Sequence, residues 1–190
     1  MAWFAAIVIA AMLIALSLWG YDRFVNPQAR IDPEALEGVR FPTVRGSSLS
    51  GRRYTLPQDI EGEIALVMIA FQQVHQFDVN TWLPVARDLS QQYEALAYYE
   101  LPTIDRLNPA ARTFIDGGMR AGIPDPVARA TTITLYLDKP AFRQALEIPD
   151  EESIVVMLID RRGEVLWRVS GPATPEAIEA LQQAAKASLE

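Results

Sequence analysis

The single histidine of the chain, His75, follows an apolar run at residues 63–71 and precedes Asp78 by three positions. A histidine beside a carboxylate can act as a general base. One histidine cannot hold zinc alone, and the chain has no cysteine to complete such a site. No nucleophile accompanies the pair. We therefore predict no catalytic residue, no cofactor and no metal site, and we interpret His75 as a polar surface residue.

Two further groups of residues could bind ions or phosphates. Asp150, Glu151 and Glu152 form an acidic run that could hold a hard cation weakly, but we interpret it as a solvated loop before a buried strand. Gly117 and Gly118 are not followed by the Lys and Ser/Thr of a phosphate loop, so we interpret them as a turn that ends a helix. These residues therefore add no chemical site.

Charge and cysteine content exclude several classes of protein. The formal net charge is −7 and no dense basic run occurs beyond Arg52 and Arg53, which argues against a nucleic-acid partner. The absence of cysteine excludes disulfides, thiol catalysis and thiolate metal sites, and leaves the redox compartment open.

Residues 2–20 contain no charged side chain, and as a helix they would span about 28 Å. Trp3 and Trp19 stand at the two ends, where interfacial aromatic residues belong. We predict one transmembrane helix that anchors the protein in the cell (inner) membrane. A cleaved secretory signal is the main alternative, although no Lys/Arg region precedes the apolar stretch, and a buried core helix is another. Flanking charges leave the side of the membrane undecided.

The rest of the chain predicts one α/β domain over residues 39–190, after a polar linker over residues 21–38. Half of the residues are hydrophobic, which is enough for a sizeable core. Apolar runs alternate with segments of helical periodicity, which predicts a mixed sheet with helices on both faces. The predicted strands are 41–44, 53–56, 63–71, 95–101, 131–137, 154–159 and 164–169, and the predicted helices lie near 82–93, 109–115, 140–146 and 175–189.

The clearest pattern is at the C-terminal end of the domain. Residues 154–159 are apolar and mostly β-branched, residues 160–163 form a turn in which Gly163 can adopt positive φ, and residues 164–169 alternate. Thr174 caps a helix that has Pro175 in its first turn. Pro84, in contrast, lies inside a helical pattern and predicts a kink or a late start. In the strand at 95–101 we expect one of Tyr98 and Tyr99 in the core and the other exposed.

This order of elements resembles the thioredoxin superfamily. By spacing, Gln76 and Val79 stand where redox members have their two cysteines, and Ser153 stands where their cis-proline precedes a strand. Neither Gln nor Val forms a thiolate, so the resemblance implies the fold without disulfide exchange.

Residues 39–181 also resemble the assembly-factor family for the membrane sector of the mitochondrial ATP synthase, which has a degenerate thioredoxin-like domain. The resemblance rests on Phe41-Pro42, on Trp82 with Pro84, and on the stretch 158–174, which contains Asp-x-x-Gly-x-x-x-Trp-x-x-Ser-Gly. Where that family commonly has Arg before the Trp, this chain has Leu166, and Arg168 follows. The resemblance implies a membrane-protein client, here the ATP synthase membrane sector.

We therefore predict a membrane-anchored, non-catalytic thioredoxin-like protein that binds a membrane-protein client as an assembly factor or chaperone. The expected contact surface is the loop at residues 72–79 with the adjacent helix start. An accessory subunit of a membrane complex is an alternative, and a thiol-independent enzyme using His75 and Asp78 is another. The candidate contact residues are Gln72, His75, Gln76, Trp82, Trp167 and Arg168, although the patterns around the two tryptophans favour a place in the core.

Overall fold

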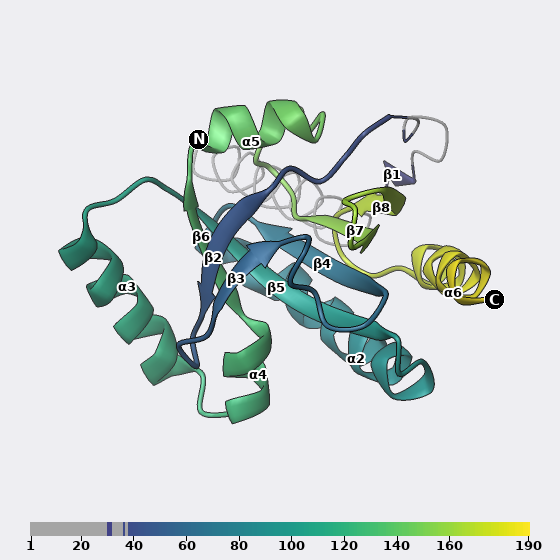
Figure 1. The fold of residues 1–190 in the computed structure, drawn as a ribbon, viewed down its shortest axis with the longest axis horizontal. Coiled ribbons are helices and arrows are strands. Elements are labelled where there is room, and N and C mark those ends of the chain that lie inside the picture. Colours follow the sequence, from purple (N-terminus) through teal and green to yellow (C-terminus); the bar gives the residue numbers. More distant parts are fainter. Residues whose placement is uncertain (1–29, 32–35, 37) are drawn as a thin grey trace, which may run out of the picture.

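The computed structural model describes residues 30–31, 36 and 38–190, which form an α/β domain around one eight-stranded sheet (Figure 1). The order of the strands across the sheet is β1-β8-β7-β4-β5-β6-β2-β3. In chain order the strands are β1 (Arg30–Ile31), β2 (Val44–Ser48), β3 (Arg53–Leu56), β4 (Ile64–Ala70), β5 (Leu96–Asp105), β6 (Ile133–Leu137), β7 (Val155–Asp160) and β8 (Val165–Ser170).

The predicted mixed sheet is confirmed, and β4 lies near its centre. This strand pairs in parallel with β5 and antiparallel with β7, and β5 pairs in parallel with β6. Six of the seven residues of β4 are buried, as expected for a strand covered on both faces.

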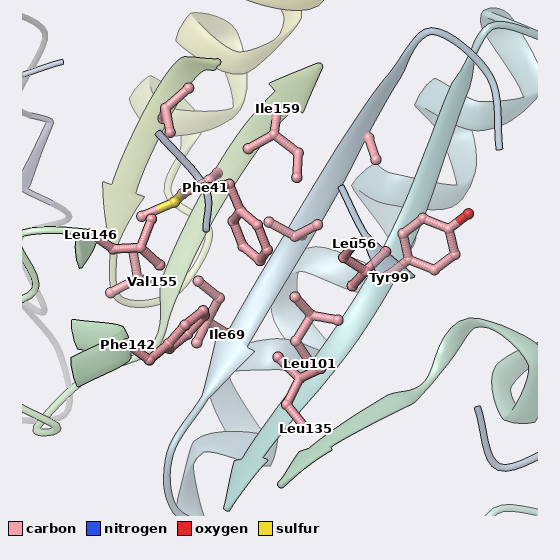
Figure 2. Close-up of a cluster of buried hydrophobic side chains, with 14 of the residues drawn as sticks. Phe41, Leu56, Ile69, Tyr99, Leu101, Leu135, Phe142, Leu146, Val155 and Ile159 are labelled. Atoms are coloured by element: carbon pink, nitrogen blue, oxygen red, sulfur yellow. The ribbon is translucent and has the colours of Figure 1, made fainter. Parts of the chain in front are cut away.

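Helices cover both faces of the sheet, as the sequence predicts. The helical elements are η1 (Gln73–His75), α2 (Gln76–Gln92), α3 (Pro109–Gly122), α4 (Pro126–Thr131), α5 (Lys139–Ala145) and α6 (Pro175–Leu189). Helices α2 and α6 pack on one face through Trp82 and Leu181. The other face carries α5 and the segment before β2, whose Phe41 ring meets the Phe142 ring edge-on at 5.8 Å (Figure 2).

The predicted C-terminal hairpin and helix are confirmed. The Asp160 carboxylate accepts the backbone N–H groups of Arg162 and Glu164, each at 2.8 Å, and Gly163 has a φ of +83°. The Thr174 hydroxyl accepts the Ala177 N–H at the start of α6. Side-chain bonding in the turn and at the helix start therefore follows the local sequence.

The first predicted strand is displaced along the chain. We expected a strand at residues 41–44, whereas β2 runs over Val44–Ser48 and includes Gly46. A Cβ at Gly46 would lie 2.6 Å from the Ile133 Cγ2 atom, so glycine lets β2 approach β6 closely. Strand pairing with β6 thus overrides the turn preference of the Gly/Ser residues.

The prediction that Gly117 and Gly118 end a helix is wrong, because α3 continues to Gly122. Glycine costs only about 1 kcal/mol in a helix, and tertiary bonds hold the second half of α3 in place. The Asp116 carboxylate accepts the Tyr136 hydroxyl at 2.7 Å, and the Arg120 Nε donates to the Leu49 carbonyl at 2.7 Å. The short helix α4, which Asp125 caps, was not predicted.

Two other expectations about local structure differ from what is found. Tyr98 and Tyr99 point to opposite faces of β5, as expected, but both are buried, because helices or loops cover both faces there. Helix α2 begins at Gln76 and continues through Pro84, so the late start that Pro84 suggested does not occur.

The predicted transmembrane helix at residues 2–20 and most of the predicted linker lie outside the described residues. Within the linker, Arg30–Ile31 forms β1 and pairs with Val169 and Ser170 of β8. None of the helices in the described part of the chain is long and apolar enough to cross a membrane.

Candidate functional site

The candidate site is the segment 72–79, here called the 72–79 edge, which joins the end of β4 to the start of α2. It contains η1 and the first turn of α2. The buried residues Val79 and Trp82 anchor that first part of the helix to the sheet. The edge therefore presents its exposed side chains from a fixed backbone.

His75 is the internal anchor of this edge, and the prediction that it is a surface residue is wrong. Its side chain is 97% buried, with a relative exposure of 3%. Its Nδ1 atom accepts the Phe71 backbone N–H at 3.2 Å, so the proton of the neutral ring stays on Nε2. Nε2 has no hydrogen-bond partner among the described residues. The helix start brings the ring back onto the end of β4, which a linear pattern does not reveal.

Burial sets the protonation of His75 and Asp78. Burial lowers the pKa of His75, and the nearby Asp78 carboxylate opposes that change. Burial also raises the pKa of Asp78, against the effect of His75. The imidazole is thus neutral at pH 7, but it is enclosed, and a general base must reach its substrate.

Gln72 and Gln76 are exposed, and both tie the 72–79 edge to neighbouring elements. The Gln72 Nε2 donates to the Glu151 carbonyl at 2.7 Å, in the loop before β7. Glu151 in turn pairs with Lys139 at 2.5 Å and with Arg143 at 3.3 Å. The Gln76 Nε2 donates to the Glu100 carboxylate at 3.3 Å. The edge is therefore braced by α5, β5 and the acidic loop.

Glu100 is a buried acid that sequence analysis did not single out. Only 5% of it is exposed, and it lies in the interior of β5. Burial raises its pKa, while the hydrogen bond from Gln76 opposes that rise. A charged residue inside the apolar strand at 95–101 was the signal available in the sequence.

Trp82 and Trp167 belong to the core of the domain. Trp82 is fully buried and its Nε1 donates to the Gly171 carbonyl at 3.0 Å. Trp167 is 7% exposed and packs edge-on against Trp82 at 5.9 Å between ring centroids. Its buried indole N–H has no hydrogen-bond partner among the described residues.

Arg168 lies away from the 72–79 edge. It alternates with Trp167 along β8, so the two side chains leave opposite faces of the strand. Its guanidinium donates to the Leu146 carbonyl at 2.8 Å and to the Glu147 carbonyl at 3.2 Å, just after α5. The structure therefore brings together Gln72, His75 and Gln76, whereas Arg168 braces the end of α5.

Two exposed apolar side chains give the 72–79 edge its chemical character. Phe77 is 76% exposed and Val74 is 59% exposed. Sequence analysis predicted this loop as a contact surface but did not name these residues. Of the two residues that spacing sets at the expected thiol positions, Gln76 is exposed and Val79 is buried. In the described part of the chain no three His, Asp or Glu side chains gather closely enough to hold a metal ion.

Neither a protein-family model nor a curated protein matches this chain. Solved structures do match. A putative electron transfer protein from Aquifex aeolicus VF5 superposes with a TM-score of 0.54 at 10% identity, covering 78% of this chain and 96% of that one. BsSco, a member of the Sco family of cytochrome c oxidase assembly proteins, gives 0.51 at 11% identity, with 78% and 94% covered.

The exposed lipoprotein thioredoxin Etrx1 of Streptococcus pneumoniae strain TIGR4 gives a TM-score of 0.50 at 11% identity, with 76% of this chain and 98% of that one covered. At these identities the likeness establishes the fold. The chain thus has a thioredoxin-like α/β fold, and it carries no cysteine.

Proposed function

We propose that this chain is a non-redox, thioredoxin-like binding module that holds a membrane-protein client as an assembly factor does. The observation that carries the proposal is the exposure of Phe77 and Val74 on the 72–79 edge. Aromatic side chains that anchor interfaces contribute much of the binding energy. At this edge a redox relative would need a thiolate, and here an apolar contact surface takes its place.

The bracing of the edge supports a binding role. The His75–Phe71 and Gln72–Glu151 hydrogen bonds fix the backbone on either side of Val74. A surface that is already ordered loses little conformational entropy on binding, so more of the contact energy appears as affinity.

Charge around the edge indicates the kind of client. Asp150 and Glu152 are exposed in the loop that Gln72 contacts, and the half-exposed Asp78 lies in the first turn of α2. An apolar segment flanked by basic residues is complementary to such an acidic rim. The predicted anchor at residues 2–20 would keep the domain beside membrane clients.

The family resemblance supports the membrane sector of the ATP synthase as the client to test first. BsSco, which shares the fold, belongs to a family of cytochrome c oxidase assembly proteins. That likeness makes an assembly role compatible with the fold but does not transfer a client, since function resides in the site.

The test is photo-crosslinking from position 73, which is exposed on the same edge, in the tagged full-length chain in native membranes, followed by mass spectrometry. Phe77→Glu should lower client recovery at least tenfold, because it removes a central anchor. Phe114→Glu is the matched control, since Phe114 is 84% exposed on α3, away from the edge. It should leave recovery unchanged.

Stoichiometry separates the two candidate roles. Substoichiometric recovery of newly made subunits supports an assembly factor, whereas stoichiometric recovery with a mature complex indicates an accessory subunit. Client recovery that Phe77→Glu leaves intact would refute the proposed surface.

A further inference from the structure

A second polar site lies far from the 72–79 edge, on the sheet beside α3. It is a pocket of about 530 Å³ between α3 and the strands β6, β2 and β3, which Figure 1 shows next to one another. A volume of this size suits a small organic ligand. Its lining includes Arg45, Arg53, Arg112, Asp116, Thr134 and Tyr136.

Strand alternation gathers the polar side chains on this one face. Arg45 pairs with Thr55, and Ser47 pairs with both Arg53 and Thr134. Gly46, between them, faces Ile133 and Leu135 in the core. Because successive side chains alternate, Arg45, Ser47, Arg53 and Thr134 share the opposite face, toward α3.

The arginines of this face lack internal counterions. Arg45 and Arg53 are diagonal cross-strand neighbours, close enough for two long side chains with like charges to repel. Neither side chain makes an ion pair or hydrogen bond with the described residues, whereas the adjacent Arg52 pairs with Glu61. An anion placed between Arg45 and Arg53 would remove the repulsion and use both guanidinium forks.

The rest of the pocket is suited to the same ligand. The Arg112 guanidinium lies 5.0 Å from the centre of the Tyr136 ring, and its Nε donates to the Leu107 carbonyl. Its Nη groups make no hydrogen bond with the described residues. The Asp116 carboxylate accepts the Tyr136 hydroxyl, so it is already engaged. The second carboxylate of the lining, that of Asp59, accepts the Thr55 backbone N–H. Three arginines therefore face two carboxylates here, in a chain with a net charge of −7.

Thr134 supplies an independent sign of a ligand. It is 98% buried, with a relative exposure of 2%, and it lines the pocket. Its Oγ1 has no hydrogen-bond partner in the described chain. A buried hydroxyl without a partner is costly, and an oxygen of a bound ligand would satisfy it.

We propose that this pocket binds a small organic oxyanion, whose phosphate or carboxylate group bridges Arg45 and Arg53 and accepts a hydrogen bond from the Thr134 hydroxyl. The oxyanion can belong to a soluble metabolite or to a lipid headgroup, and the same guanidinium chemistry recognises both. This site does not depend on the client-binding role of the 72–79 edge.

The test is calorimetric titration of the full-length chain with inorganic phosphate and with citrate, alongside sedimentation with phosphatidylcholine vesicles that contain phosphatidic acid. The double variant R45Q/R53Q should weaken binding of the active probe at least tenfold. The control Arg106→Gln removes an exposed arginine that does not line the pocket, and it should bind like the wild type.

A second variant tests the buried hydroxyl while keeping the shape of the side chain. Thr134→Val should weaken binding several-fold without lowering the melting temperature. Binding to vesicles alone that R45Q/R53Q abolishes would assign the oxyanion to a lipid headgroup. Failure of every probe to bind, or binding that R45Q/R53Q leaves intact, would overturn the proposal.

Discussion

Replacing Gly163 with alanine tests the contact between the β7–β8 turn and the start of the domain. Gly163 has a φ of +83°, where an L side chain costs about 1–2 kcal/mol. The new Cβ would also lie 2.6 Å from the Phe41 carbonyl oxygen and 3.2 Å from the Pro57 Cγ atom. The variant therefore combines backbone strain with a steric clash.

Phe41 cannot withdraw without loss. Its N–H donates to the Gly163 carbonyl at 2.7 Å, and its ring is 97% buried against Phe142. Overpacking of this kind costs about 1–3 kcal/mol. Together the two effects predict a loss of about 2–5 kcal/mol, a large part of a typical stability of about 5–15 kcal/mol.

Gly171→Ala is the matched control, because Gly171 has a φ of +93° and a Cβ there would meet nothing within 4 Å. It should cost only the strain of positive φ. Both variants are measured by denaturant unfolding of the full-length chain, with the free energy of unfolding as the readout. If Gly163→Ala and Gly171→Ala lose the same stability within about 0.5 kcal/mol, the Phe41 segment does not press on the turn and the reasoning is refuted.

Two further predictions concern the pH dependence of stability. The pKa of Glu100 is raised in the folded state, so the stability of the fold falls as pH rises above about 4.5. Glu100→Gln should therefore be more stable than the wild type at pH 7. Denaturant unfolding at pH 4 and pH 7 should show this gain only at pH 7. The pKa of His75 is lowered on folding, so the unfolded chain takes up the proton first and stability falls as pH drops below about 6.5. His75→Gln should lower the free energy of unfolding by about 1–2 kcal/mol at pH 7, because it disrupts the hydrogen bond that His75 accepts from the Phe71 N–H. It should also flatten the fall of stability below about pH 6.5. An unchanged slope of stability against pH would show that His75 does not titrate on unfolding.

Much of the fold could be predicted because its signals are local. The apolar run that becomes β4, the turn at Asp160 and Gly163, and the Thr174 cap each depend on neighbouring residues. Sequence also placed the expected contact surface on the loop at 72–79. It could not select Phe77 over His75 as the exposed residue, because exposure depends on how the helix start packs against β4 and the loop before β7.

The amino-acid sequence by itself determined that this chain carries no cysteine, and it indicated the order of the main strands and helices of the domain. Only the tertiary structure decided what covers each face. It buried His75, Trp82 and both Tyr98 and Tyr99, and it continued α3 through Gly117. It also brought Arg45, Arg112 and Thr134 into one pocket. Periodicity specifies which side chains share a face, whereas burial and neighbours depend on contacts between segments that are distant in the chain.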